Sequence, residues 1–156
     1  MKQYIGSKIV KAWPAIRFQR GPEFAPEYAE VGDIVPGGAK VQDGYRVQYE
    51  DGYLSWSPKA VFEEAYRETT GMSFGLAIEA MKKGLRVARN GWNGKYMYVF
   101  LAYEADFVTD ADLSAFDQLE VEVGDMLVMK TAQNTFQPGW LASQADMLAD
   151  DWYIVE

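Results

Sequence analysis

Two turns in the sequence place tryptophan beside glycine, which is a pattern suited to holding a flat ligand. The first turn, GWNG at residues 91–94, contains Trp92 and Asn93, and the second places Trp140 directly after Gly139. Glycine beside an aromatic ring removes side-chain cover and lets a ligand approach the backbone. Alternatively, each indole packs over a sheet and leaves its N–H near water. The residues alone leave both interpretations open.

The polar residues near these turns are of the types that bind nucleotides. Arg89 and Lys95 flank the first turn and are placed to contact phosphate, and a guanidinium can bind two phosphate oxygens at once. Ser143 and Asp146 follow the second turn, although both residue types also cap helices. Nucleotide binding needs aromatic faces together with a few donors, acceptors and cations. The candidate ligand-binding residues are therefore Arg89, Trp92, Asn93, Trp140, Ser143 and Asp146, whereas Trp152 is expected in the core.

The amino-acid composition excludes catalytic sites that depend on histidine or cysteine. The 156 residues include no histidine and no cysteine, which excludes Ser-His-Asp and Cys-His nucleophiles and the usual zinc sites. No spacing singles out a pair of carboxylates for hydrolysis. Catalysis by carboxylates, lysine, tyrosine or an oxygen-bound metal stays open, so composition makes an enzyme less expected without excluding one, and no catalytic residue, cofactor or metal site stands out. The absence of thiols suits a cytoplasmic protein, and no apolar run approaches the length of a membrane span.

Charge is distributed unevenly along the chain. The net charge of −8 argues against binding to DNA, RNA or an anionic membrane. Residues 81–95 nevertheless carry five basic side chains and no acidic one, whereas residues 96–156 carry one basic residue against twelve acidic ones. A small anion is therefore expected to bind near the basic segment, and a polyanion is expected to be repelled by the acidic remainder.

The first part of the chain is predicted to be a small accessory domain, residues 1–67, built from a β-hairpin and a helix. Residues 21–40 are rich in proline and glycine and are expected to form a loop. Two alternating aromatic runs meet at Asp51-Gly52, which is typical of a hairpin. A helix is expected from Pro58 to about Arg67, and residues 68–71 follow as a linker.

The second domain, residues 72–156, is predicted to be a small antiparallel sheet with one long and one short helix. The long helix begins after Ser73 and ends at Gly84, and the short helix or turn pair lies within residues 140–149. A polar, acidic stretch from residue 104 to 118 is expected to be an exposed loop or partly helical. Strands are expected at residues 85–89, 96–103, 119–123, 126–130 and 151–155. Helices do not alternate regularly with the strands, so the fold class is α+β.

Two segments of the second domain together resemble one protein family. MSFGLAIEAMKKGLRVARNGWNGKYMYVFL begins at Met72, and GWLASQADMLADDWYIVE ends at Glu156. Their paired signatures, A-x-x-G-W-N-G and W-x-x-S-x-x-D-x-L-A-x-D-W, are similar to those of the second type of phage Thoeris anti-defence protein. The resemblance covers residues 72–156 and does not extend to residues 1–70.

The resemblance implies a non-enzymatic sponge that acts in the cytoplasm of the infected bacterium. Such proteins sequester cyclic ADP-ribose-type signals made by TIR-domain defence proteins, and some also take up cyclic dinucleotides. They form homo-oligomers, typically tetramers, with pockets where protomers meet. Two alternatives remain: an enzyme that cleaves such nucleotides, and a protein-interaction module that inhibits a host protein through its exposed tryptophans.

Overall fold

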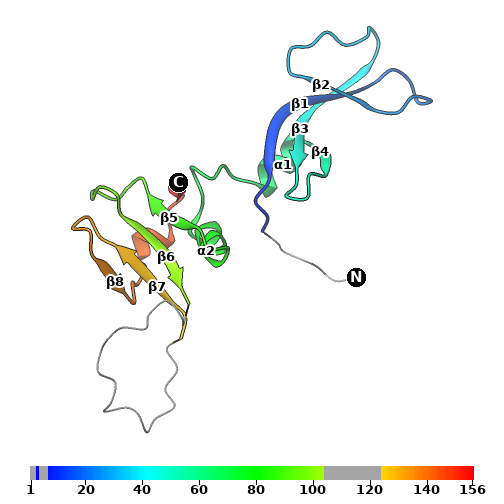
Figure 1. Cartoon of the computed structure of the whole chain (residues 1–156). Helices are drawn as coiled ribbons and strands as arrows, with labels where there is room; N and C mark the ends of the chain where they lie inside the picture. Colours follow the sequence, from blue (N-terminus) through cyan, green and yellow to red (C-terminus); the bar gives the residue numbers. More distant parts are fainter. Residues whose placement is uncertain (1–2, 4–6, 104–123) are drawn as a thin grey trace, which may run out of the picture. The chain divides into compact units, whose positions relative to one another are not determined.

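The computed structural model describes residue 3, residues 7–103 and residues 124–156, and these fall into two compact units. The first unit is Met1–Arg67 and the second is Glu68–Glu156. Each unit has its own antiparallel sheet (Figure 1). This arrangement confirms the predicted α+β class. The expected linker includes Thr69, whose carbonyl accepts a hydrogen bond from the Ile154 amide of the second unit.

The first unit is a four-stranded sheet in the order β2-β1-β3-β4, with one helix. The elements are β1 (Lys11–Gln19), β2 (Glu27–Glu30), β3 (Lys40–Gln48), β4 (Leu54–Pro58) and α1 (Lys59–Ala65). The predicted hairpin is confirmed as β3 and β4, whereas the segment expected to be a loop contains β2. Its four residues EYAE pair with β1, and so short an edge strand gives little sequence signal beside proline and glycine.

Helix α1 packs against β3 and β4 through stacked aromatic rings. The rings of Tyr45 and Phe62 lie 4.3 Å apart, and Tyr66 stacks on Phe62 at 4.7 Å. The predicted proline start is confirmed with a shift of one residue, because Pro58 is the N-cap of the helix and the last residue of β4. These contacts cover one face of the sheet at its β4 end.

The second unit is a five-stranded sheet in the order β8-β7-β6-β5-β9 with two helices. Its elements are α2 (Phe74–Lys82), β5 (Arg86–Arg89), β6 (Tyr98–Ala102), β7 (Met126–Lys130), β8 (Phe136–Pro138), α3 (Gln144–Met147) and β9 (Trp152–Val155). Strand β8 lies where no strand was predicted, because three exposed residues leave no alternating pattern to detect. The acidic stretch and the strand expected at residues 119–123 lie outside the described residues.

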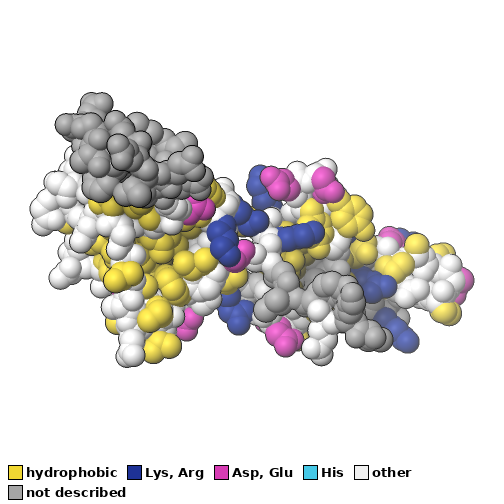
Figure 2. Space-filling view, turned by 90° about the horizontal axis from the view of Figure 1, so that it is seen from below, with side chains coloured by type: hydrophobic (Ala, Val, Ile, Leu, Met, Phe, Trp, Pro, Cys, Tyr) yellow, Lys and Arg dark blue, Asp and Glu magenta, His cyan; other side chains and the backbone are white. Residues whose placement is uncertain are grey.

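Helix α2 packs against β5, β6 and β9 and covers the core of the second unit. Ser73 is its N-cap, and Gly84 follows its last turn with a φ of +80°, a backbone conformation that glycine adopts without strain. The buried core residues are Met72, Ala77, Ala80, Met81, Val87, Val99, Met129 and Trp152. Hydrophobic side chains also reach the surface of this unit (Figure 2). Exposed examples are Tyr96, Phe136, Leu141 and Leu148.

Candidate ligand-binding site

Three tryptophans from separate segments meet in the second unit. Trp92, Trp140 and Trp152 contact one another edge to face, with ring centroids 5.4–6.3 Å apart. Trp152 is fully buried, which confirms its predicted core position, whereas the other two indoles are half-buried. In edge-to-face packing, the edge of one ring contacts the face of another, so part of each indole surface is already covered. The two tryptophan turns therefore converge in space, and their indoles also take part in the core.

Asp146 joins these indoles to the start of α3. Its side chain forms a capping box with Ser143, in which Ser143 Oγ and N donate to Oδ2 at 2.6 and 3.1 Å. The other carboxylate oxygen accepts from Trp92 Nε1 at 3.0 Å and from Arg89 Nη1 at 2.8 Å. Trp152 Nε1 donates to the Asp146 carbonyl at 2.9 Å. One carboxylate thus connects α3, the GWNG turn and β5.

Arg89 lies between two carboxylates. Its Nε donates to Asp151 at 2.7 Å, and Asp151 also accepts from the Gly91 amide at 2.6 Å. The side chains of Arg89 and Asp146 are only 15% and 12% exposed. The hydrogen bonds to Asp151 and Asp146 raise the pKa of Arg89, and the bond from Arg89 lowers the pKa of Asp151. Since both carboxylates already hold Arg89, its main role here is to position the turn.

Low pH should reduce the stability of the second unit, because Asp146 becomes protonated. Burial raises the pKa of this carboxyl, but the hydrogen bonds from Ser143, Arg89 and Trp92 lower it more, from 3.8 to about 2. A group whose pKa is lower when folded stabilises the fold above its unfolded pKa and loses that contribution as pH falls. We expect the free energy of unfolding to fall by about 2 kcal/mol between pH 4 and pH 2 because of this group.

Urea unfolding at several pH values tests this expectation. Other carboxyl groups also titrate in this window, so the comparison is with Asp146→Asn, which cannot ionise. The difference in stability between the wild-type protein and this variant should shrink as pH falls from 4 to 2. A difference that stays constant across this range would contradict a stabilising role of the ionised carboxylate.

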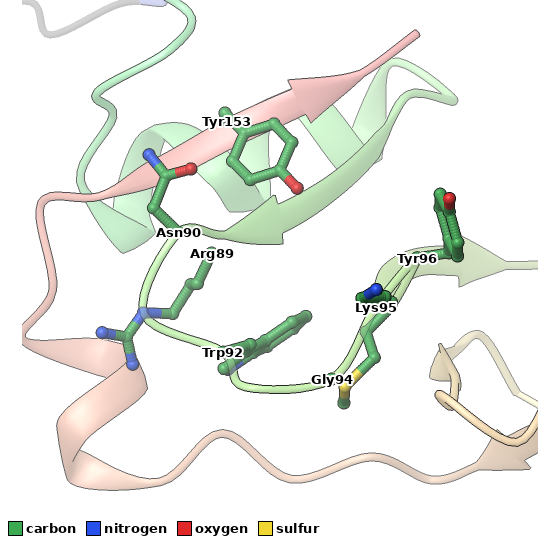
Figure 3. Close-up of a pocket in the computed structure, with 8 residues that line it drawn as sticks. Arg89, Asn90, Trp92, Gly94, Lys95, Tyr96 and Tyr153 are labelled. Atoms are coloured by element: carbon green, nitrogen blue, oxygen red, sulfur yellow. The ribbon is translucent and has the colours of Figure 1, made fainter.

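A pocket of about 390 Å³ opens beside this network (Figure 3). The side chains of Trp92 and Tyr153 point toward it, from the turn after β5 and from β9. Tyr96 is 84% exposed at its rim and has a φ of +57°. A side chain at Gly94 would overlap the Met97 side chain and approach Ala132 Cβ at 3.0 Å, so a larger residue there would require Met97 to move. The lining residues are Arg89, Asn90, Trp92, Gly94, Lys95, Tyr96, Met97 and Tyr153.

Two of the six candidate residues line this pocket, Arg89 and Trp92. Asn93 is exposed on the same turn outside the lining. The structure brings Trp140, Ser143 and Asp146 to the packing and capping network behind the pocket. That placement matches the packing and capping alternatives for these residues.

Sequence reasoning did not select Tyr153 or Tyr96 for the site. The alternation in WYIV contained the signal for Tyr153, because a strand that buries Trp152 must turn the next side chain to the opposite face. Tyr96 was expected to begin a strand, but β6 starts two residues later. Its left-handed backbone, which is uncommon outside glycine, asparagine and aspartate, has no marker in the sequence.

The chemistry of the pocket is aromatic and cationic. Three rings and two cations line it, and the lining contains no carboxylate. Arg89 is engaged by two acids, whereas Lys95 is exposed and has no ion pair among the described residues. Lys95 is therefore the lining cation with ammonium donors available to a phosphate. Such a pocket suits a flat, anionic molecule that contributes both rings and phosphates.

The comparisons assign the second unit to a family. The Thoeris anti-defense 2-like domain matches residues 72–155. A Thoeris anti-defense 2 protein of Bacillus phage SP01 is 41% identical over 87 residues, which cover 55% of this chain and 97% of that protein. The chain belongs to the Thoeris anti-defense 2-like family. This membership supports a phage anti-defence role, and it confirms the family that the two signature segments indicated.

None of the helices in the described residues has the length and apolar character needed to span a membrane. The described residues also contain no group of three or more acidic residues close enough together to hold a metal ion.

Proposed function

We propose that the second unit captures a cyclic ADP-ribose-type signal, or a related cyclic dinucleotide, and holds it without cleaving it. The infected host cell is the proposed place of action, because bacterial immune effectors respond to such signals there. Family membership supports the anti-defence role. The pocket supports the chemistry of the ligand, because its exposed rings and the available ammonium of Lys95 suit a base and a phosphate.

The single observation that carries this proposal is the pocket between the GWNG turn and β9. Trp92 and Tyr153 offer rings from two sides, and Lys95 and Tyr96 lie at the rim (Figure 3). Sequestration requires nanomolar binding, which corresponds to about −12 kcal/mol. Ring stacking at about 1–3 kcal/mol per base and charged hydrogen bonds at about 1.5–3 kcal/mol each are the contributions available, reduced by the cost of association.

We also propose a homo-oligomer, with a tetramer favoured. The exposed hydrophobic side chains of the second unit include Phe136 on the edge strand β8 and Leu141 and Leu148 beside α3. Their burial against another copy would remove apolar surface from water. Light scattering coupled to size exclusion measures the assembly directly, and a monomer at micromolar concentration would contradict the oligomer.

A capture-and-release experiment tests the function. The protein is mixed with cyclic ADP-ribose isomers or cyclic dinucleotides, the free ligand is measured, and the protein is then denatured by heat. Stoichiometric loss followed by full recovery of the intact molecule is expected. Recovery of a cleaved product in excess of the protein would identify an enzyme instead. Absence of binding together with a stable host-protein complex would favour the interaction module.

Two rim variants should weaken capture without unfolding the protein. Lys95→Gln removes an ammonium that forms no ion pair with the described residues. Tyr96→Gly removes an exposed ring at a position where glycine suits the positive φ. We expect each to raise the Kd about tenfold or more, as measured by isothermal titration calorimetry. Trp92→Ala is less informative, because it also removes packing and the hydrogen bond to Asp146.

The matched control for the lysine variant is Lys83→Gln. Lys83 is exposed at the C-cap of α2 and does not line the pocket. Its removal should change the Kd less than twofold or so, because a distant exposed charge is screened by salt. Equal weakening by Lys83→Gln and Lys95→Gln would show that overall charge controls binding. Unchanged affinity in both rim variants would rule out this pocket as the site.

A further inference from the structure

The sheet of the first unit has one face that α1 does not cover. Residues paired across antiparallel strands share a face, so the register identifies the side chains on it. Trp13 pairs with Arg46, which pairs with Trp56, and Arg17 pairs with Tyr28. Helix α1 packs through Tyr45, whose side chain belongs to the opposite face. We call this set the arginine–tryptophan face: Trp13, Arg17, Tyr28, Arg46 and Trp56.

The arginines of this face lie on its aromatic rings. The Arg46 guanidinium is 4.3 Å from the centre of the Tyr28 ring, and the Arg17 guanidinium is 5.5 Å from that of Trp56. Among the residues that the structure describes, neither arginine forms an ion pair. A guanidinium on a ring keeps its in-plane N–H donors available to an anion.

Small residues between these side chains let them lie across the sheet. Ala15 and Gly44 form the intervening pair, and both are buried. A side chain at Gly44 would overlap the Trp56 ring and the Ser57 carbonyl oxygen. Trp13 and Tyr28 remain 39% and 45% exposed. The face therefore offers exposed rings at its surface and two half-buried guanidinium groups.

Charge on this face is positive although the chain as a whole is acidic. The first unit holds nine basic and nine acidic residues, so the excess of acid lies in residues 68–156. By strand register, the arginine–tryptophan face also carries Lys11 and Lys40, against one acidic residue, Glu30. The face thus differs in charge from the acidic second unit.

One further group lacks a partner. Trp56 Nε1 is buried and has no hydrogen-bond acceptor within the described part of the chain. Buried donors are normally paired, so this indole N–H is an unused donor in the ring over which the Arg17 guanidinium lies.

We propose that the arginine–tryptophan face binds single-stranded nucleic acid. Rings and guanidinium planes stack unpaired bases, while cations contact phosphates. A duplex would leave the rings unused because its bases are already stacked, and an acidic peptide would use only the charges. Trp13 and Arg17 are four residues apart on β1, about 13 Å, which spans about two nucleotides. This proposal concerns a site separate from the pocket of the second unit.

Under this proposal, the argument from net charge against nucleic-acid binding applies to the acidic second unit and not to the arginine–tryptophan face. Repulsion from that unit should keep the interaction weak, with a Kd of roughly 10⁻⁶ to 10⁻⁴ M and a marked dependence on salt. Weak, salt-dependent binding without sequence preference is the behaviour expected of a flat stacking surface.

Fluorescence anisotropy with the full chain tests the proposal. The probe is a fluorescein-labelled oligonucleotide of about fifteen thymidines at about 50 mM salt. Arg17→Gln/Arg46→Gln should raise the Kd about tenfold and reduce the salt slope by about 1.4, which corresponds to two phosphate contacts. Trp13→Ala should raise the Kd about tenfold while leaving the charge unchanged. Circular dichroism checks that each variant remains folded.

The charge control is Lys59→Gln/Lys83→Gln, which removes two exposed cations outside the face. Its Kd should stay within about twofold of the wild-type value. No binding up to about 100 µM, or equal binding by the wild-type protein and the face variants, would overturn the proposal. Equal binding of a polyglutamate peptide, sensitive to the same variants, would also overturn it by assigning the face to acidic chains. Capture of cyclic nucleotides should be unchanged in the face variants. The experiment therefore tests this proposal separately from the function proposed for the second unit.

Discussion

Replacing Trp152 by alanine should lower the free energy of unfolding of the second unit by about 3–5 kcal/mol. The side chain is fully buried and contacts Phe74, Trp92 and Trp140. Its removal leaves a cavity where α2, β9 and the GWNG turn meet, and it deletes the hydrogen bond to the Asp146 carbonyl. Loss of this size is a large part of the stability of a small domain.

Two further variants separate the causes of this loss. Trp152→Phe keeps much of the apolar volume but cannot donate to Asp146, so an intermediate loss is expected. Lys83→Ala, at an exposed side chain on the C-cap of α2, should change stability by less than about 0.5 kcal/mol. Urea unfolding followed by far-ultraviolet circular dichroism measures all three variants. A loss below about 1 kcal/mol for Trp152→Ala would show that the indole is not central to the core.

Elements with strong periodicity or clear terminal signals could be predicted from the sequence. Helix α2 is an example, because Ser73 precedes an apolar helical repeat and Gly84 ends it. The hairpin of β3 and β4 likewise follows from two alternating runs around Asp51-Gly52. Strands β2 and β8 could not be predicted, because they are short edge strands whose existence depends on pairing with β1 and β7. Edge pairing is a tertiary effect that local patterns do not encode.

The sequence marked the two tryptophan turns as candidates for a binding site, but it did not determine how their residues are arranged. The sequence could not show that these turns meet in space, whereas the structure places the rings of Trp92 and Trp140 6.0 Å apart. The sequence also could not indicate that Arg89 is held by two carboxylates from positions 57 and 62 residues away. The pocket-lining side chain of Tyr153 comes from the last strand, and only the fold places it opposite the GWNG turn (Figure 3).

Asp146→Ala should destabilise the second unit by about 2–4 kcal/mol, as expected when several hydrogen bonds of a part-buried carboxylate are removed together. The substitution leaves the Arg89 guanidinium with Asp151 alone, removes the acceptor of Trp92 Nε1 and opens the capping box of Ser143. A residue that acted only by touching a ligand would leave stability unchanged when truncated. The experiment therefore separates a structural role of Asp146 from the binding role that its sequence position suggested.

Asp150→Ala is the matched control, because it removes the same charge at an exposed position four residues away. It should change the free energy of unfolding by less than about 0.5 kcal/mol. Arg89→Met combined with Asp146→Ala should recover part of the loss, because the double variant no longer holds a half-buried arginine short of a partner. Strictly additive losses would contradict direct coupling between the two side chains. If Asp146→Ala has normal stability but no longer captures the ligand, the carboxylate contacts the ligand directly. The hydrogen bonds around Asp146 would then contribute to ligand binding and not to the stability of the fold.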